Sequence, residues 1–348
     1  MDFFEPQVNE RKQHHNFKNI LIPERECERR IFNSWAKGFV DRDKKLIKEF
    51  QTTFNSSFWE VYLFQVFKDL ELTVDWSKAT PDFSVSSQEN EFIVEATTAN
   101  AANGKPNEWD KKFDAEEIAK TKRFAEINRE AIIRLSNAFL YKSKKYLESY
   151  SKIEHVKGKP FVLAIAPFEQ PYFNLQYNRP ISALLYNQYV NEDVYLDNPE
   201  EYPNGPPTEF LDFVEKDNGA EIPLGFFANN DFEHISAVIF SSTATWGKLS
   251  AMGIDFGSDV EVGSVWSHTA DGIPVKHLYS NQEHNERAVD GLQIYHNPFA
   301  TNPLPFELFN KKGIVQSYYD PEYGNITRYG LDHALYFRTV TRITRKIL

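Results

Sequence analysis

The sequence predicts a mixed α/β fold in which a central sheet is flanked by helices. Short runs with the pattern of strands lie at residues 82–86, 91–97, 161–166 and 235–240. Two longer stretches, 57–70 and 128–149, carry apolar residues at helical spacing and contain neither proline nor glycine. Strands and helices that are interspersed along a chain favour an α/β sheet over an all-helical or all-β core.

The first two strands are expected to form a hairpin. Residues 86–90 are a polar turn between two short apolar runs, and Asp82 stands at the start of the first run. In the second run Glu95 and Thr97 share one face, because successive side chains of a strand point to opposite faces. An antiparallel pairing then brings Asp82 and Glu95 to the same end of the sheet. Taken singly, each acid is explained equally well as a solvated group at a strand edge.

A third carboxylate, Glu60, lies in the predicted helix 57–70, for which the serines at 56 and 57 offer an N-cap. Carboxylates on one helix and one hairpin can bind a hard divalent cation. Mg²⁺ takes oxygen ligands and usually combines one or two carboxylates with waters and a substrate phosphate. Asp82, Glu95 and Glu60 are therefore the predicted metal ligands.

This arrangement resembles the PD-(D/E)XK nuclease superfamily, which has the restriction-endonuclease-like fold. The resemblance covers roughly residues 54–166, about a third of the chain. Glu60 matches the helical acid, Pro81-Asp82 the PD motif, and Glu95-Ala96-Thr97 the E-x-K motif. It implies a restriction-endonuclease-like core that uses Mg²⁺ or Mn²⁺ to hydrolyse phosphodiester bonds, in defence against foreign DNA or in DNA repair. The sequence departs from the family at Thr97, where the family has the lysine that helps to position and polarise the attacking water.

Lys142 is predicted to replace that lysine. It lies on the apolar stripe of the helix 128–149, three residues after Phe139 and four before Tyr146. Lys142-x-x-x-Tyr146 has the spacing of the Gln-x-x-x-Tyr motif of one branch of these nucleases, and several members carry their lysine on this helix. Lys142 is thus the fourth candidate catalytic residue, with Thr97 and Tyr146 in supporting roles. An equally good explanation is that the lysine stem covers the core while its ammonium group reaches solvent.

The charge distribution allows a nucleic-acid partner despite a net charge of −11. Residues 101–160 contain 14 basic and 9 acidic residues, whereas the remainder of the chain has a net charge of −16. A phosphate backbone would be attracted to this segment, with Lys144 and Lys145 as expected contacts and DNA favoured over RNA. An ordinary charged helix surface also explains the excess.

The chain divides by pattern into three parts. Residues 1–53 are expected to be an N-terminal arm and extension, loose over 1–20, helical over 24–35 and strand-like over 46–51. Residues 54–310 would form the nuclease-like α/β domain, with an insertion at 167–233. Residues 311–348 would be a C-terminal extension packed on the core, and both extensions are expected to be irregular.

The single cysteine favours a reducing compartment, and the sequence shows neither a signal-peptide core nor a membrane-length apolar run. A cytoplasmic protein without a membrane partner, monomeric or homodimeric, is the expectation.

Two functions of different classes remain. The first is a Mg²⁺- or Mn²⁺-dependent nuclease, a phosphodiester hydrolase that acts through a metal-activated water. The second is a catalytically inactive nuclease-like fold that binds nucleic acid or a protein partner, and Thr97 favours it.

Overall fold

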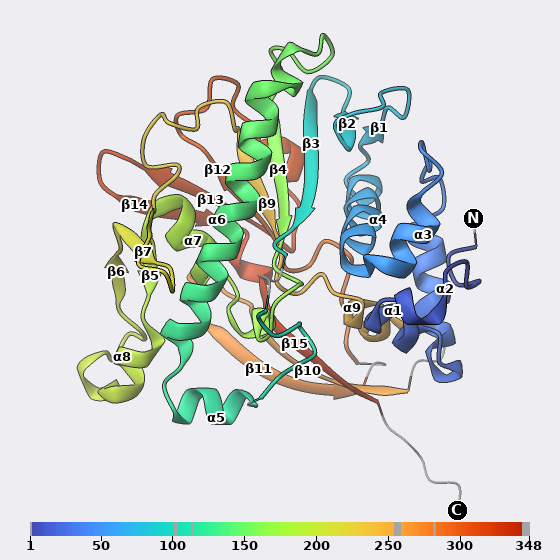
Figure 1. Cartoon of the computed structure of the whole chain (residues 1–348). Helices are drawn as coiled ribbons and strands as arrows, with labels where there is room; N and C mark the ends of the chain where they lie inside the picture. Colours follow the sequence, from blue (N-terminus) through green and yellow to red (C-terminus); the bar gives the residue numbers. More distant parts are fainter. Residues whose placement is uncertain (1, 101–103, 113, 254–258, 281–282, 343–348) are drawn as a thin grey trace, which may run out of the picture.

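The computed structural model describes residues 2–100, 104–112, 114–253, 259–280 and 283–342. It is a mixed α/β structure with a large mixed central sheet flanked by helices (Figure 1). The helices are α1 His15–Ile20, α2 Glu26–Trp35, α3 Leu46–Thr52, α4 Phe54–Asp69, α5 Ala115–Lys120, α6 Phe124–Glu148, α7 Arg179–Tyr186, α8 Glu192–Asp197 and α9 Gly247–Ala251.

The central sheet has eight strands in the order β1-β2-β3-β4-β9-β12-β13-β14. They are β1 Thr73–Val74, β2 Phe83–Ser86, β3 Glu91–Thr98, β4 Phe161–Ala166, β9 Ala237–Phe240, β12 Leu292–His296, β13 Ile314–Asp320 and β14 Asn325–Tyr329. Strands β3, β4 and β9 run parallel at its centre, and β12 is antiparallel to β9. The four strands and two helices predicted for the α/β core are present.

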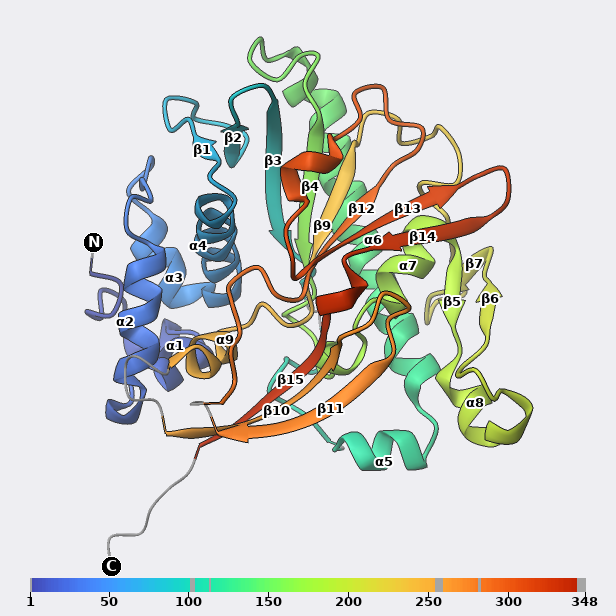
Figure 2. The same cartoon turned by 180° about the vertical axis from the view of Figure 1, so that it is seen from behind.

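The remaining strands form smaller sheets. β10 Val260–Ser267, β11 Pro274–Ser280 and β15 Leu335–Arg342 make a three-stranded antiparallel sheet, which lies below the central sheet in Figures 1 and 2. β5 Gln188–Val190 pairs with β6 Thr208–Phe210, and β7 Phe213–Glu215 pairs with β8 Glu221–Pro223. These last four strands belong to residues 167–233, which connect the neighbouring parallel strands β4 and β9.

The centre of the sheet is buried on both faces. Alternate residues of β3 and β4 pack into two different apolar clusters, one shared with α4 and the N-terminal helices and the other with α6 and α7. Every residue of β4 is buried, as its continuous apolar sequence predicts for a central parallel strand. Figures 1 and 2, seen from opposite sides, show α6 across one face of β3, β4 and β9. The long helices are thereby fixed against the strands that carry the candidate site.

Residues 46–51 are helical in α3, so the expected strand is wrong. A six-residue run fits both periodicities, and Leu46 and Phe50 are both buried when they lie one helical turn apart. The predicted serine cap is also wrong. Thr53 is both the C-cap of α3 and the N-cap of α4, which leaves the serines at 56 and 57 inside the first turn of α4.

Residues 2–20 are not a loose arm. Phe3, Phe17 and Ile20 are buried, and the Phe3 ring lies 5.2 Å from that of Phe32 and 5.3 Å from that of Phe50. Aromatic pairs at this spacing favour ordered packing. At the other end, β13 and β14 extend the central sheet beyond residue 310, so this part of the predicted C-terminal extension is regular and belongs to the sheet. None of the helices that the structure describes is long and apolar enough to cross a membrane.

Trp59 is expected to be the residue of α4 whose loss destabilises the fold most. Its ring is fully buried, and its Nε1 donates to the carbonyl of Ala164 in β4 at 3.0 Å. Trp59→Ala should reduce the free energy of unfolding by about 3–5 kcal/mol, the usual cost of removing a large buried aromatic ring. Tyr141→Ala, at a position 68% exposed on α6, is the control and should change it by less than about 0.5 kcal/mol. Urea denaturation followed by circular dichroism measures both, and equal effects would contradict this view of the core.

Candidate metal and nucleic-acid site

Asp82 and Glu95 come together through the register of the hairpin. Phe83 of β2 pairs with Val94 of β3, so Asp82, one residue before β2, lies opposite Glu95. Asp82 Oδ2 also accepts a hydrogen bond of 2.7 Å from the backbone N–H of Ala96, which fixes the carboxylate beside β3. The prediction that the two acids lie at the same end of the sheet is confirmed.

A cavity of about 480 Å³ contains the groups predicted from the sequence. Glu60, Asp82, Glu95, Thr97 and Lys142 all line it, and so does Lys145. They come from α4, the β2–β3 hairpin and α6, three parts of the chain that are separated in the sequence. Its other lining residues are His14, Glu49, Thr52, Thr53, Ser56, Ser57, Ala96, Thr98, Asn100 and Glu169.

Glu95 is the best-connected carboxylate of the cavity. It is 1% exposed, and its Oε1 accepts from Lys142 Nζ at 2.7 Å, Lys145 Nζ at 3.0 Å and the Tyr150 hydroxyl at 3.1 Å. A buried charge is costly unless it is paired and hydrogen-bonded. These three donors therefore stabilise the buried carboxylate of Glu95. Its other oxygen, Oε2, is buried and has no hydrogen-bond partner among the described residues. One oxygen of Glu95 is therefore held by the protein and the other is not.

The ammonium group of Lys142 reaches Glu95 as predicted, and that of Lys145 reaches it as well. Both ammonium groups reach the same oxygen, from positions three residues apart on α6, which is close to one helical turn. Although burial opposes it, the hydrogen bond to Tyr150 and the negative charge of Glu95 raise the pKa of Lys145. Lys145, which was predicted as a nucleic-acid contact and as a weaker candidate than Lys142 for the missing lysine, is thus a member of the charged site.

Two other residues named from the sequence lie outside the cavity lining. Lys144 is exposed and pairs with Glu148 across a turn of α6. The Tyr146 ring packs against Phe161, with ring centroids 4.4 Å apart, and stacks on His234. Tyr146 belongs to the apolar cluster beneath α6, so its spacing from Lys142 has a packing explanation.

Tyr150 also contacts Glu95, but the sequence pattern did not predict it as a site residue. It lies in the 3-10 helix Tyr150–Lys152 directly after α6, where the helical period that located Lys142 ends. Its place eight residues after Lys142, close to two helical turns, was the available signal. The hydroxyl adds a neutral donor to the two cations at Glu95.

The carboxyl groups opposite Glu95 are electrostatically strained. Burial, followed by the charge of Glu95, raises the pKa of Asp82 to about 6 despite the opposing charge of Lys142. Burial and the charge of Asp82 raise the pKa of Glu60 well above its usual value. Desolvated acids beside like charges favour their neutral forms. Ionisation of Asp82 and Glu60 therefore lowers the free energy of unfolding at neutral pH.

Asp82 and Glu95 are compatible with Mg²⁺, which usually takes only one or two carboxylate ligands from the protein. The described residues hold no group of three or more histidine, cysteine, aspartate or glutamate side chains arranged to hold a metal ion. Two carboxylates with waters and a phosphate are nevertheless a common Mg²⁺ environment. A cation placed between the two carboxylates would pair with the unpartnered Glu95 Oε2 and would lower the raised pKa of Asp82.

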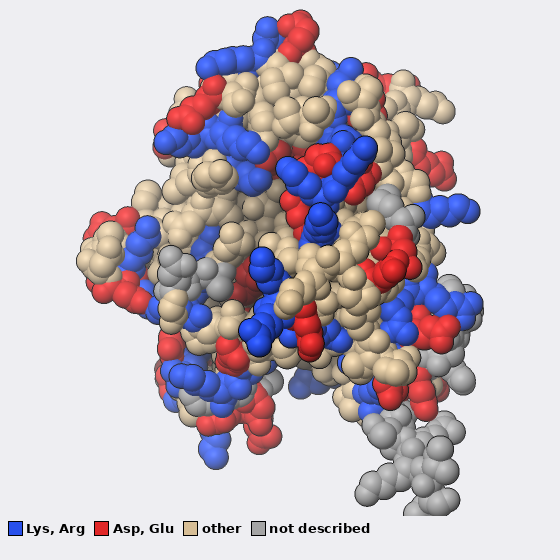
Figure 3. Space-filling view, turned by 45° about the vertical axis from the view of Figure 1, so that its right-hand side comes forward, with Lys and Arg blue, Asp and Glu red and all other residues tan. Residues whose placement is uncertain are grey.

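The basic excess of residues 101–160 is mostly neutralised locally. Lys105 and Arg129 both pair with Asp217, and Lys157 pairs with Glu154. The face in Figure 3 shows basic and acidic side chains interspersed, without one large patch of either sign. The cations of this segment that line the cavity are Lys142 and Lys145.

Asp82→Asn is expected to stabilise the metal-free protein above pH 6. The pKa of Asp82 is raised from 3.8 to about 6 in the folded protein, so the folded state favours the proton. The cost of ionisation is absent well below pH 4 and is fully present above pH 6. The variant keeps an oxygen for the Ala96 N–H. Its melting temperature in EDTA should therefore exceed that of wild type at pH 8 and match it near pH 3.5.

Asp75→Asn is the matched control. Hydrogen bonds with Ser77 lower the pKa of this exposed carboxyl near β1, so its neutralisation should bring no gain at pH 8. If both variants shifted the melting temperature alike, the strain assigned to Asp82 would be refuted.

No family model, curated protein or solved structure matches the chain, so the case for its function rests on the geometry above.

Proposed function

We propose that the chain is a Mg²⁺- or Mn²⁺-dependent nuclease that hydrolyses phosphodiester bonds in DNA. The observation that carries the proposal is the placement of Lys142. Its ammonium group bonds Glu95 Oε1 at 2.7 Å, while Glu95 Oε2 stays without a partner and Asp82 is held alongside by Ala96. A lysine from α6 thus contacts the Glu95 carboxylate in the cavity that Thr97 also lines, which supports the proposal that it replaces the motif lysine.

The order of the elements supports a restriction-endonuclease-like core. Helix α4 is followed by the β2–β3 hairpin, and α6 then leads to β4, which is parallel to β3. The acids of this proposal stand on α4, before β2 and on β3, in the order that the motif requires. The mixed α/β architecture itself does not depend on this assignment.

Each group has a distinct role in the proposed reaction. Asp82 and Glu95 would hold the cation, with Glu60 supporting it from α4. A bound Mg²⁺ or Mn²⁺ would polarise the phosphodiester and lower the pKa of the attacking water. Lys142 and Lys145 would stabilise the negative charge that develops on the phosphate, in a cavity where water screens that charge poorly.

One observation favours a protein that binds without cutting. Glu95 Oε1 already accepts from two ammonium groups and a hydroxyl, so the protein itself neutralises this carboxylate. In that case the cavity would bind a nucleic-acid phosphate through Lys142 and Lys145, and a cation would contribute little.

Cleavage that depends on Mg²⁺ or Mn²⁺ and on Asp82 is the expected result. Wild type should cut supercoiled, linear or single-stranded DNA with either metal and be inactive in EDTA. Asp82→Asn should lose cleavage and also weaken Mn²⁺ binding measured by titration calorimetry, since it removes a charged ligand. Because the same variant is expected to be more stable than wild type, loss of activity cannot be assigned to unfolding. Absence of cutting by wild type with both metals would leave the binding protein as the better account.

The two lysines are expected to share one role. Since both reach Glu95 Oε1, Lys142→Ala should reduce the cleavage rate partially, and Lys142→Ala/Lys145→Ala should reduce it about 100-fold or more. Mn²⁺ affinity should be retained, because neither lysine is a ligand. Lys152→Ala is the control, since its ammonium group donates to the carbonyl of Glu148 away from the site. Full activity of the double variant would exclude the migrated lysine.

A further inference from the structure

A second cavity lies beside the carboxylate cavity and has no role in the proposed reaction. Its volume is about 400 Å³. The two cavities are lined by neighbours in the sequence, such as His14 with His15, Asn55 with Ser56, and Phe168 with Glu169. The second cavity also lies where the chain leaves the parallel strands β4 and β9, and ligands of open α/β sheets usually bind outside the carboxyl ends of their strands.

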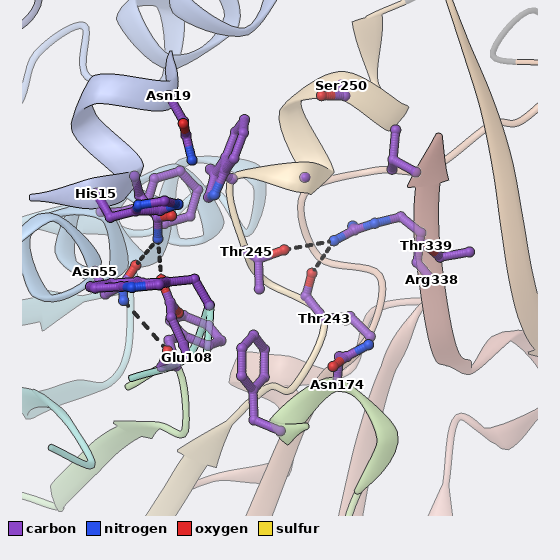
Figure 4. A pocket seen from close by; sticks show the side chains of 18 of the residues that line it. His15, Asn19, Asn55, Glu108, Asn174, Thr243, Thr245, Ser250, Arg338 and Thr339 are labelled. Carbon is purple, nitrogen blue, oxygen red and sulfur yellow. Dashed lines mark hydrogen bonds between the residues drawn. The ribbon is translucent and has the colours of Figure 1, made fainter. Parts of the chain in front are cut away.

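Three arginines give this cavity a positive wall. Arg25, Arg338 and Arg342 all line it. Arg338 is 7% exposed, and its guanidinium donates to Glu286, to the carbonyl of Thr243 at 2.7 Å and to the Thr245 hydroxyl at 3.1 Å. Figure 4 shows Arg338 held by Thr243 and Thr245, across the cavity from His15, Asn55 and Glu108.

The buried acids behind this wall do not neutralise it. Glu28 is shared by Arg25 and Arg342, and Glu286 is shared by Lys248 and Arg338. Burial opposes ionisation of Glu286, but the charges of Arg338 and Lys248 hold its pKa well below the usual value. Each group of two cations and one carboxylate therefore carries about one net positive charge.

The same wall has hydrogen-bond donors to spare. The Nε atoms of Arg25, Arg338 and Arg342 and the hydroxyl of Ser242 are buried without a partner among the described residues. Unsatisfied buried donors are costly, and a ligand with several charged acceptor oxygens would offer them strong hydrogen bonds. Phosphate is such a ligand, and Arg is the side chain best matched to it.

The opposite wall suits a planar, hydrogen-bonding group. Trp109 is 38% exposed, and its ring stacks on His15 with centroids 4.6 Å apart. Asn16, Asn55 and Glu108 form a connected set beside it. Burial and the charge of Glu169 raise the pKa of Glu108 to about 7, against hydrogen bonds from Asn55 and Asn16. Aromatic faces with amide and carboxyl groups are the means by which proteins stack and read single bases.

We propose that this cavity binds one nucleotide, with its phosphate against Arg25, Arg338 and Arg342 and its base against Trp109 and the neighbouring amides. The nucleotide is either free or one unit of a nucleic-acid strand. The second source rests on the proposed function, because a strand that reaches both cavities would place the adjoining phosphodiester near Asp82 and Glu95.

Titration calorimetry on the full chain in EDTA tests the proposal without cleavage. The probes are inorganic phosphate, a nucleoside, the corresponding 5′-mononucleotide and a single-stranded DNA octamer. We expect the mononucleotide to bind more tightly than phosphate or nucleoside, since only it engages both walls. An octamer that binds while the mononucleotide does not supports the nucleotide unit of a strand as the source. Failure of both to bind overturns the proposal.

Two variants locate the binding. Arg342→Gln and Trp109→Ala should each weaken nucleotide or octamer binding about tenfold, which corresponds to 1.4 kcal/mol. Lys276→Gln removes a positive charge from an exposed position of β11 outside the cavity and should have no effect. Equal affinities of wild type, Arg342→Gln and Trp109→Ala would overturn the proposal. Asp82→Asn separates the two functions, because it should lose cleavage and keep mononucleotide binding. An inactive wild type that binds nucleotide would refute only the nuclease.

Discussion

The buried carboxylate of Glu95 is the constraint around which the candidate site is arranged. It lies on the inner strand β3, on the face that α6 covers, where an unpaired charge would be prohibitively costly. Two lysines and a tyrosine from α6 and the turn after it supply the missing partners at a single oxygen. Since those donors reach Glu95 only if α6 crosses β3 in one position, the ion pairs and the apolar cluster beneath the helix require the same docking. The need to pair the buried charge of Glu95 therefore fixes the position of Lys142.

For the acids next to Glu95, burial and like charge outweigh the stabilising effect of nearby cations. Asp82 and Glu60 are desolvated beside like charge, so their pKa values rise and their ionised forms destabilise the fold. Protein stability alone would favour amides at these positions. Desolvated carboxylates that share one cavity and have raised pKa values are characteristic of functional sites. Glu28 and Glu286 differ, because their pKa values are lowered despite burial, that of Glu28 mainly by hydrogen bonds from Cys27 and Ser250 and that of Glu286 by the charges of Arg338 and Lys248.

In the proposed function, the two cavities would bind different parts of a nucleic acid. The carboxylate cavity presents acids and two lysines, which suits a cation and a reacting phosphate. The arginine-lined cavity presents guanidinium groups and aromatic rings, which suits a nucleotide that is held and not cleaved. The sequence neighbours His14 and His15 contribute one side chain to each. Residues 2–20, which pack on the core through Phe3 and Phe17, therefore help to build both cavities.

The sequence by itself determined the elements that local periodicity encodes. Alternation in 91–97 placed Glu95 and Thr97 on one face, and the apolar run 161–166 predicted a central strand. The apolar stripe of α6 placed Lys142 on the face that packs on the sheet and left open whether its ammonium group turns to Glu95 or to solvent. The periodicity was ambiguous in the short run 46–51, which became a helix because Phe50 packs among aromatic rings from distant segments. Only the tertiary structure decided which cations reach Glu95. Lys145 lies at the edge of the predicted stripe and Tyr150 beyond its end, and both are recruited because a buried carboxylate needs donors from whatever backbone passes nearby. No local sequence pattern predicted the arginine-lined cavity, since Arg25, Trp109 and Arg338 come from three distant parts of the chain.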